Sequence, residues 1–335
     1  MSAPLLQVED LHVSFDIRRE GDMPWTKPLK LHAVNGVSFT LNPGETLGIV
    51  GESGCGKSTL ARALIQLVPA AGKVVWQDGT NLLGLSPHEM LKYRREVQMV
   101  FQDPLASLNP RMTVGQIIAE PLTTHHPGLS KDEVKARVQA MMEKVGLLAN
   151  QINRYPHEFS GGQCQRIGIA RALIVEPKLL ICDEPVSALD VSIQAQVINL
   201  LMKLQRELGL AMIFIAHDLS VVKHISDRVM VLYLGRAMEI AGSADLYGKP
   251  DHPYTQALLS SVPIPDPAAE RAKVTIPLDG DLPSPLAPPS GCVFRTRCLR
   301  AAPRCAADVP PLLGGNHQVA CHFPGPLMAQ AVPAA

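Results

Sequence analysis

The chain has 335 residues, of which 46% are hydrophobic and 19% charged, a composition typical of a globular protein with one large domain or two modest ones. Lysines plus arginines and aspartates plus glutamates number 31 each, so the balanced charge argues against a nucleic-acid partner bound through a broad basic face. The sequence shows neither a basic, apolar leader nor a run of about 18 apolar residues, so we expect a cytosolic protein with reduced cysteines.

The first elements are predicted to be mainly strands. Alternating apolar and polar residues predict a strand over 6–15, and the polar, proline-containing stretch 18–30 predicts a loop. Residues 31–51 predict two more strands joined by a turn at "NPGE". A helix is expected from Lys57 through Val68, and a further strand over 73–79.

The middle of the chain alternates between strands and helices. From about residue 113 to 149 the apolar period is helical, and another helix follows "SGGQ". A short buried strand is predicted over 178–185, then a helix over 192–208 and a strand over 211–217. This alternation predicts an α/β core with a parallel sheet and an inserted, mostly helical subdomain.

The stretch "GESGCGKST" fits the pattern of a phosphate-binding loop. It follows a predicted strand and opens a predicted helix, which is the context that supports the motif over a plain glycine-rich turn. Backbone amides and the helix N-terminus would face phosphate oxygens, Lys57 would reach the β- and γ-phosphates, and the Ser58 hydroxyl would ligate magnesium. The predicted nucleotide-binding residues of this loop are Gly51, Ser53, Gly54, Cys55, Gly56, Lys57, Ser58 and Thr59.

Two acids at the end of a buried strand are candidates for the hydrolytic step. Asp183 is predicted to hold magnesium, directly or through water, and Glu184 to activate the attacking water, which contributes about 10²–10⁴-fold to a rate. His217 is a candidate contact to the γ-phosphate, and Gln102 a candidate ligand of the metal or the water. Taken alone, a histidine after a strand or a single glutamine is more often an ordinary loop residue.

Six motifs occur in the order and spacing of an ATP-binding cassette: "GESGCGKST", "FQ", "SGGQ", "ICDEP", "SALD" and "AHD". The chain resembles this family over nearly its whole length, and "SGGQ" separates the family from other phosphate-loop ATPases. The resemblance implies an α/β phosphate-loop ATPase with a parallel-sheet core, an N-terminal antiparallel β subdomain and an inserted α-helical subdomain at about residues 104–154. It also implies ATP and Mg²⁺ as cofactors.

The same resemblance implies that two cassettes pack head to tail around two ATP molecules. Each nucleotide would then contact the phosphate loop of one chain and the signature of the other, Ser160, Gly161, Gly162 and Gln163, at a helix N-terminus. Asp190 of "SALD" would lie at the dimer interface, and Phe15 would stack on adenine. For Phe15 a plain core position is the alternative, and Trp25 is a weaker candidate for stacking.

Further stretches, among them "RYPHEFSGGQ" and "DHPYTQALLSSVPIPD", resemble the ATPase subunits of bacterial dipeptide and oligopeptide importers, in particular the F-type subunits of dipeptide permeases. This resemblance implies a heterodimer with a second ATPase subunit, two membrane permeases and an external peptide-binding protein, at the cytoplasmic side of the inner membrane. Residues 103–116 are the predicted permease contact. A soluble regulatory or repair-type cassette without a transport role is the alternative.

The end of the chain changes in composition. We predict a nucleotide-binding domain over 1–261 and a C-terminal extension over 262–335, whose proline-rich first part, residues 262–290, is a linker or an extended arm. Four of the seven cysteines follow this part: Cys292, Cys298, Cys305 and Cys321.

In a reducing compartment, four clustered thiols indicate a metal site more than disulfides. The spacing lacks the tight C-x2–4-C pairs of most zinc sites, and the family resemblance implies a 4Fe–4S cluster. A four-thiolate zinc site and four unligated thiols are the alternatives. The interleaved arginines are expected to offset the negative charge of a cluster: Arg295, Arg297, Arg300 and Arg304.

Overall fold

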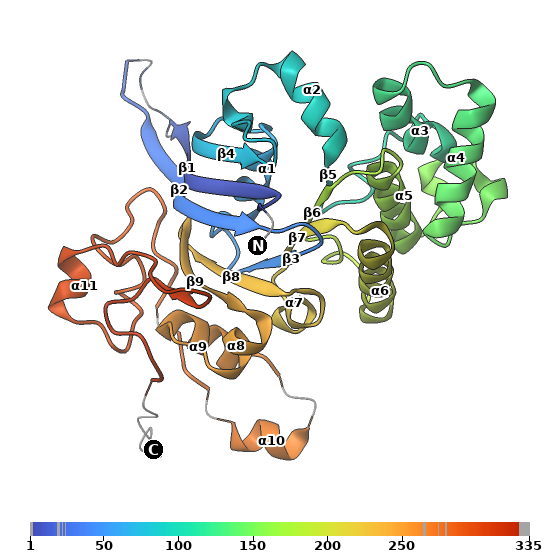
Figure 1. Ribbon diagram of the computed structural model, residues 1–335. Coiled ribbons are helices and arrows are strands. Elements are labelled where there is room, and N and C mark those ends of the chain that lie inside the picture. The colour runs from blue at the N-terminus through green and yellow to red at the C-terminus, as the bar shows by residue number, and fades with distance from the viewer. Residues whose placement is uncertain are drawn as a thin grey trace. The chain divides into compact units, whose positions relative to one another are not determined.

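The computed structural model describes residues 3–18, 21, 23, 25–263, 266–273, 275–278 and 280–327 (Figure 1). The chain divides into two compact units. The first unit comprises Met1–Gln7, Thr40–Leu47 and Val74–Ala216, and the second comprises Val8–Phe39, Gly48–Lys73 and His217–Ala335. The predicted boundary between residues 261 and 262 stays a prediction.

The first unit is built on three parallel strands with β6 in the middle. Leu179 at the start of β6 pairs with Val97 of β5 on one side and with Ala211 of β7 on the other. Every residue of β6 and β7 is buried, as expected for a parallel sheet covered on both faces. The elements of this unit are α2 (Pro87–Glu96), β5 (Val97–Val100), α3 (Val114–His125), α4 (Lys131–Lys144), α5 (Gly161–Leu173), β6 (Leu179–Asp183), α6 (Val191–Leu208) and β7 (Ala211–Ile215).

Helices α3, α4 and α5 lie side by side and pack against one another (Figure 1). Each begins with a capping box, in which a Ser or Thr hydroxyl accepts from a backbone N–H three residues on and a Glu or Gln there returns the bond. The three cap pairs are Thr113 with Gln116, Ser130 with Glu133, and Ser160 with Gln163. The helical reading of residues 113–149 is therefore confirmed, with a break between α3 and α4.

The second unit contains an antiparallel hairpin of β8 and β9. The strands are joined by Leu234 and Gly235, both with positive φ (44° and 74°), the backbone that a two-residue hairpin turn requires. The C-terminal strand β10 pairs antiparallel with β9. The elements of this unit are most of β1 (Leu6–Ile17) and β2 (Leu29–Leu41), α1 (Lys57–Leu64), α7 (Leu219–Ile225), β8 (Arg228–Tyr233), β9 (Arg236–Gly242), α8 (Ser243–Gly248), α9 (Pro253–Ser260), α10 (Pro267–Ala272), α11 (Pro303–Ala307) and β10 (Gln318–Val319).

Two strands, β3 (Thr46–Val50) and β4 (Ala71–Trp76), begin in one unit and end in the other along the chain. The four strands predicted before residue 80 are confirmed as β1, β2, β3 and β4. Helix α1 ends at Leu64 rather than at Val68, because Gln66 adopts a left-handed φ of 55° and Pro69 disfavours a helical residue before it. Among the described residues, no helix is both long and apolar enough to cross a membrane.

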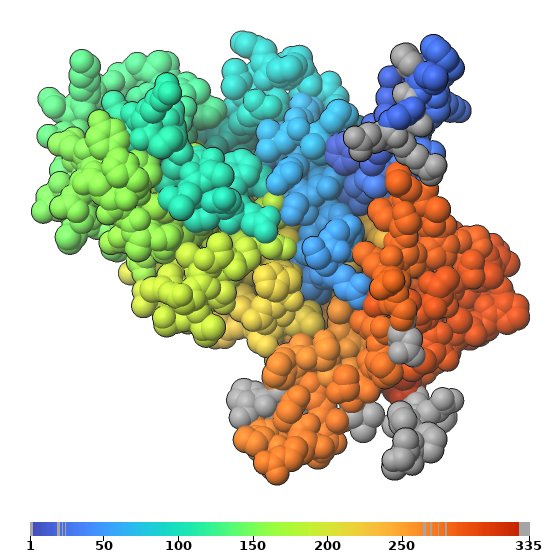
Figure 2. All heavy atoms as spheres, turned by 180° about the vertical axis from the view of Figure 1, so that it is seen from behind, coloured from blue at the N-terminus to red at the C-terminus, as the bar shows by residue number. Residues whose placement is uncertain are grey.

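The C-terminal residues of the second unit gather into one mass, orange to red in Figure 2. Helix α8 packs on β8 and β9, and α9 packs on β9. The proline-rich stretch contains one short helix, α10, and otherwise no regular element among its described residues, which fits the predicted extended arm. Residues 328–335 of the predicted extension lie outside the described part of the chain.

Candidate functional site

The phosphate-loop sequence forms the turn between β3 and α1. Gly51 and Gly56 have φ of 151° and 104°, which L side chains rarely adopt. A Cβ atom on Gly51 would lie 2.1 Å from the carbonyl oxygen of Leu232, and one on Gly56 would lie 2.2 Å from that of Ala33. The loop is therefore packed so closely against backbone that only glycine fits at these two positions.

The ammonium group of Lys57 is folded onto the loop. Its Nζ donates to the carbonyl oxygens of Gly51 at 2.8 Å and Glu52 at 3.0 Å and lies 3.9 Å from Cys55 Sγ. Burial raises the pKa of the Cys55 thiol, and the nearby ammonium offsets this only in part. The loop thus holds one buried cation beside a protonated thiol, at the N-terminus of α1.

Four other predicted loop residues are accessible. Ser53 and Gly54 are exposed, and Ser58 and Thr59 in the first turn of α1 are half-buried. Their hydroxyl and amide groups can therefore meet a ligand from solvent, which is the arrangement that anion binding at a helix N-terminus needs.

The predicted acids lie at the carboxyl end of β6 in the first unit. Asp183 is fully buried as the last residue of the strand. Glu184 follows with a positive φ of 46°, and its N–H donates to the carbonyl oxygen of Ile215 at 3.0 Å. Side chains held in such sparsely populated backbone conformations are often found at functional sites.

Gln102 and Glu184 are brought together by the parallel sheet. Val100 pairs with Cys182, so the residues that follow β5 and β6 emerge at the same edge. The amide Nε2 of Gln102 donates to Glu184 Oε2 at 3.1 Å. His217, which follows β7 and opens the last segment of the second unit, keeps its role as a prediction.

The signature forms the N-terminus of α5. Ser160 is the N-cap: its hydroxyl accepts from Gln163 N–H at 3.4 Å, and its own N–H donates to the Gln163 side chain at 2.9 Å. Ser160 and Gly161 are exposed, and Gly162 and Gln163 are half-buried. Asp190 is the exposed N-cap of α6 and makes no side-chain capping bond. Both helix starts are thus open to a ligand or a second chain.

The two candidates for adenine stacking differ in burial. Phe15 on β1 is half-buried, whereas Trp25 is 80% exposed. A half-buried ring fits both a stacking platform and an edge of the core, so this choice stays open.

The prediction of a 4Fe–4S cluster is wrong. All four C-terminal cysteines line one cavity, but its volume is only about 10 Å³, the space of one water molecule. No group of three or more His, Cys, Asp or Glu side chains in the described part of the chain is placed to hold a metal ion, so the zinc alternative finds no site either. Burial and the neighbouring thiols raise the pKa of Cys292 to about 11, which favours the thiol over the metal-binding thiolate.

The interleaved arginines have other partners than a cluster. Arg295 donates to the carbonyl oxygen of Ser290, Arg300 to those of Phe323 and Gly325, and Arg304 lies 3.9 Å from Asp308. Arg297 forms an ion pair with Glu52 of the phosphate loop at 2.9 Å. The pairing of Glu52 with Arg297 was not predicted, because nothing local in the sequence links positions so far apart; Arg297 was predicted only to offset the charge of a cluster.

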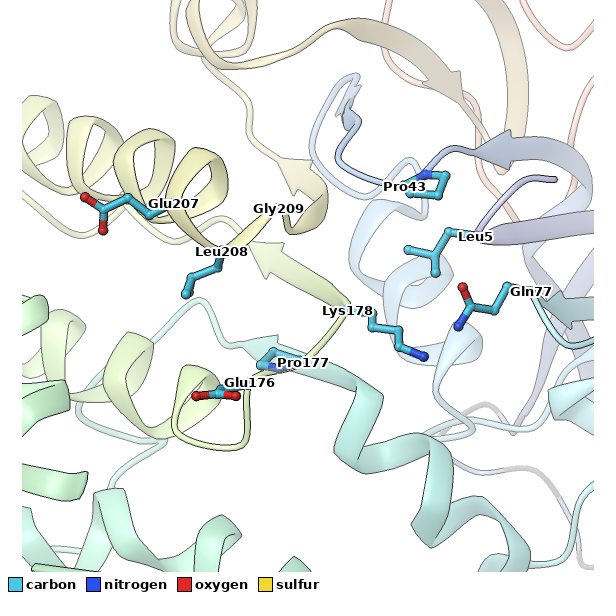
Figure 3. Close-up of a pocket in the computed structure, with 9 residues that line it drawn as sticks. All are labelled: Leu5, Pro43, Gln77, Glu176, Pro177, Lys178, Glu207, Leu208 and Gly209. Carbon is cyan, nitrogen blue, oxygen red and sulfur yellow. The ribbon is translucent and has the colours of Figure 1, made fainter. Parts of the chain in front are cut away.

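A cleft of about 490 Å³ lies elsewhere in the first unit (Figure 3). Pro177 and Lys178 directly precede β6, and Leu208 and Gly209 lie at the end of α6, shortly before the start of β7. The cleft is therefore at the amino ends of these strands, whereas ligands of open α/β sheets bind outside the carboxyl ends. Gln102 and Glu184 lie at the carboxyl ends, so the cleft is no part of the candidate site.

Comparison with known proteins agrees with this geometry. The family described as "ABC transporter" matches residues 34–187, and the "Oligopeptide/dipeptide transporter, C-terminal region" matches residues 238–305. The chain is 64% identical to the oligopeptide transport ATP-binding protein OppF of Salmonella typhimurium over 96% of this chain and 97% of that protein, and equally to OppF of Escherichia coli. Neither of these relatives is named as an iron–sulfur protein.

Solved structures show the same fold. The dimeric post-hydrolysis structure of the ATP-binding cassette MJ0796, bound to ADP and phosphate, superposes with a TM-score of 0.63 at 27% identity, over 71% of this chain and 98% of that one. CbiO1 from Clostridium perfringens superposes with a TM-score of 0.61 at 28% identity, over 73% and 91%. The chain belongs to the ABC transporter ATPases that carry the oligopeptide/dipeptide transporter C-terminal region.

Proposed function

We propose that this ATPase powers the import of oligopeptides or dipeptides by binding and hydrolysing ATP. The observation that carries the hydrolytic part is the hydrogen bond between Gln102 and Glu184 at the carboxyl ends of β5 and β6. The glycine-constrained loop before α1 supports nucleotide binding. The transport role is supported by the relatives, which are oligopeptide transport ATP-binding proteins.

The loop and the start of α1 bind the triphosphate. Backbone N–H groups of residues 53–59 and the helix N-terminus supply partial positive charge, and Lys57 supplies a full charge. In the structure Lys57 Nζ bonds carbonyl oxygens of its own loop. Phosphate oxygens are stronger acceptors for an ammonium group than neutral carbonyls, so the same group turns to the β- and γ-phosphates when the nucleotide binds.

Three side chains fit magnesium by their donor atoms. Ser58, Asp183 and Gln102 each offer oxygen, the ligand that Mg²⁺ prefers, and the amide nitrogen of Gln102 is already committed to Glu184. When bound, the cation neutralises charge that develops on the phosphate oxygens. The fully buried position of Asp183 at the end of a rigid strand fixes one carboxylate for this purpose.

Glu184 removes a proton from the attacking water. Its backbone N–H is bonded to the carbonyl oxygen of Ile215 and its carboxylate is oriented by Gln102, and this carboxylate accepts the proton. His217 contacts the γ-phosphate from the start of the segment that follows β7. These roles combine positioning with proton transfer, the main contributions expected in phosphate chemistry.

A second cassette completes each nucleotide site. The exposed N-terminus of α5, with Ser160, Gly161, Gly162 and Gln163, faces the nucleotide held by the partner chain, and Asp190 lies at the interface. Phe15 stacks on adenine. The dimeric cassette structure that resembles this chain supports such an assembly. The second chain is a related ATPase subunit, which makes the assembly a heterodimer.

The heterodimer works beneath two membrane permeases, on the cytoplasmic side of the inner membrane, and an external binding protein delivers the peptide. The nucleotide-binding domain spans 1–261, with a helical subdomain at about 104–154, and the extension spans 262–335. Residues 103–116 contact a permease, and closure of the cassettes on ATP favours one state of the transport path. No observation favours the soluble regulatory alternative.

Substitution Glu184→Gln tests the hydrolytic part of this proposal. We expect ATP hydrolysis and ATP-dependent peptide uptake to fall by about 100-fold or more, while ATP binding persists, since only the proton acceptor is removed. Glu143→Gln, on the exposed face of α4, is the matched control and leaves both rates unchanged. Hydrolysis at the normal rate in the Glu184→Gln variant would assign the base elsewhere.

A further inference from the structure

The ion pair between Arg297 and Glu52 joins the cysteine segment to the phosphate loop. Arg297 Nη1 lies 3.0 Å from one carboxylate oxygen of Glu52 and 2.9 Å from the other, across 245 positions of sequence. The side chains are only 8% and 24% exposed. Exposed pairs contribute little to stability, but a pair as buried as this one is poorly screened, and removing one partner leaves a charge uncompensated.

Glu52 is held at three groups and not only at its carboxylate. Its N–H donates to the hydroxyl of Tyr254 at 3.1 Å, and its carbonyl oxygen accepts from Lys57 Nζ at 3.0 Å. Because Glu52 is the second residue of the loop, these bonds restrict the backbone next to Gly51, where the φ of 151° is already unusual. Two of its partners, Tyr254 and Arg297, come from the C-terminal part of the chain.

Arg297 itself sits on a rigid support. Its N–H donates to the carbonyl oxygen of Phe294 at 3.0 Å. The ring of Phe294 is 2% exposed and packs against Tyr233 and Tyr254 with ring centroids 5.3 and 5.2 Å away. Burial lowers the pKa of Arg297, but its interactions with Glu52 and Tyr233 together raise this pKa above its ordinary value, so the guanidinium stays charged. The packed aromatic rings thus hold the backbone that carries Arg297, and Arg297 in turn holds Glu52 of the phosphate loop.

We propose that Arg297 is a positioning residue for ATP binding, which makes the nucleotide affinity of the phosphate loop depend on the folded cysteine segment. The inference rests on the proposed function of the loop. A loop that is already fixed in its binding conformation loses less conformational entropy when the triphosphate binds. The proposal gives Arg297 a role only through Glu52 of the loop, and the chemical step is left to Gln102 and Glu184.

A purely structural role for Arg297 predicts a different experimental result. If the ion pair served only to stabilise the second unit, its loss would lower the melting temperature without changing the affinity of the folded protein for ATP. If the pair positions the loop, its loss raises the KM for ATP while kcat is kept. The two roles are therefore separated by kinetics on folded protein and not by stability alone.

The test uses this chain with a fluorescent ATP analogue for affinity, and the chain assembled with its partner ATPase subunit for the KM and kcat of ATP hydrolysis. The variants are Arg297→Met, Glu52→Gln and the double variant, and Arg304→Met is the control. Arg304 lies on the same segment but is 65% exposed and pairs only loosely with Asp308 at 3.9 Å. A circular-dichroism melt defines the temperature at which each variant is folded.

We expect Arg297→Met and Glu52→Gln each to raise the Kd and KM about tenfold, since a charged hydrogen bond is worth about as much as the 1.4 kcal/mol that a factor of ten represents. kcat should stay within about twofold in both. The double variant should be no weaker than the weaker single variant, because either substitution alone breaks the same contact. Arg297→Lys, which keeps the charge, should recover part of the loss, and Arg304→Met should behave as the original chain.

The proposal would be overturned if the KM for ATP were unchanged in both single variants. It would also be overturned if the increase in KM of the double variant equalled the product of the two single increases. If Arg297→Met fails to fold, Glu52→Gln and Arg297→Lys still test the positioning role, because each replaces a side chain by one of similar size. Lys57→Ala serves as the separate test of the loop itself. If Lys57→Ala binds ATP normally, the proposed function fails; if it loses binding while the ion-pair variants retain it, only the positioning role fails.

Discussion

The buried carboxylate of Glu239 offers a sharp test of how the C-terminal segment is held. Glu239 lies on β9 with no exposed surface. It accepts the N–H groups of Asp251 at 2.8 Å and His252 at 3.0 Å, and a ring nitrogen of His317 lies 2.6 Å from Oε1. One side chain therefore connects the strand, the start of α9 and the segment before β10.

Glu239→Leu removes these acceptors while keeping a side chain of similar size. Each buried donor left without a partner costs about 1–3 kcal/mol, so the two amides together cost about 2–6 kcal/mol of unfolding free energy. Since the unfolding entropy is about 2.1 cal/mol/K per residue, we expect the melting temperature of this chain to fall by roughly 3–9 °C. Glu239→Gln keeps one acceptor oxygen, so its melting temperature should lie about halfway between those of the original chain and Glu239→Leu.

Scanning calorimetry on the full chain measures the shift, and hydrogen exchange at the amides of Asp251 and His252 locates it. Glu207→Leu is the control, because Glu207 is 49% exposed and pairs with Lys203 at only 3.7 Å. A melting temperature of Glu239→Leu within about 1 °C of the original would refute the reasoning, since it would show that these buried amides find other partners.

Two further predictions follow from burial and exposure. Burial lowers the pKa of His252 to about 3, so the unfolded chain binds its proton first and stability falls as pH drops from 6.5 toward 3, by about 1.4 kcal/mol per unit. His252→Asn, which can still cap α9, should show a shallower decline in urea titrations, and equal slopes would contradict the assignment. Leu105, 56% exposed within residues 103–116, is expected to contact a permease. Leu105→Asp should abolish peptide uptake in vesicles with ATP hydrolysis retained, whereas Leu148→Asp, 64% exposed outside this segment, should not; normal uptake by Leu105→Asp would exclude the contact.

Much of the site could be predicted because its determinants are local. The glycines, Lys57 and Ser58 fall within nine consecutive residues, and their spacing fixes the turn into α1. Gln102 and Glu184 are far apart in sequence, but both follow short buried strands, and parallel pairing places the ends of such strands at one edge. Local sequence pattern and parallel strand pairing together therefore make it predictable that these two side chains lie close to each other.

Other features of the structure were not predicted from the sequence. Helix α2 was not among the predicted elements, although the sequence contains its capping box, Ser86 with Glu89. The β8–β9 hairpin turns at Leu234 and Gly235 instead of the usual Asn-Gly or Asp-Gly pair, so its turn gave no clear signal. The ion pair of Glu52 with Arg297 is a tertiary contact that no periodicity encodes.

The cysteines show where spacing stops being informative. Their clustering in sequence correctly suggested that they meet, since all four line one cavity. Spacing does not report the space between the sulfur atoms or the state of the thiols, however. The small cavity and the raised pKa of Cys292 describe packed thiols, and the arginines between them bind carbonyl oxygens and carboxylates.

Strand β10 has a consequence for the solubility of shortened chains. It pairs only Gln318 and Val319 with Ile240 and Glu239, and the N–H of Ala320 donates to Met238 at 2.8 Å, yet these few bonds cover the free edge of β9. An uncovered edge offers its backbone groups to any other extended chain, and β9 is buried along nearly its whole length and rich in apolar residues. A chain cut before residue 318 would therefore expose the edge of β9 to other chains, and we expect it to self-associate.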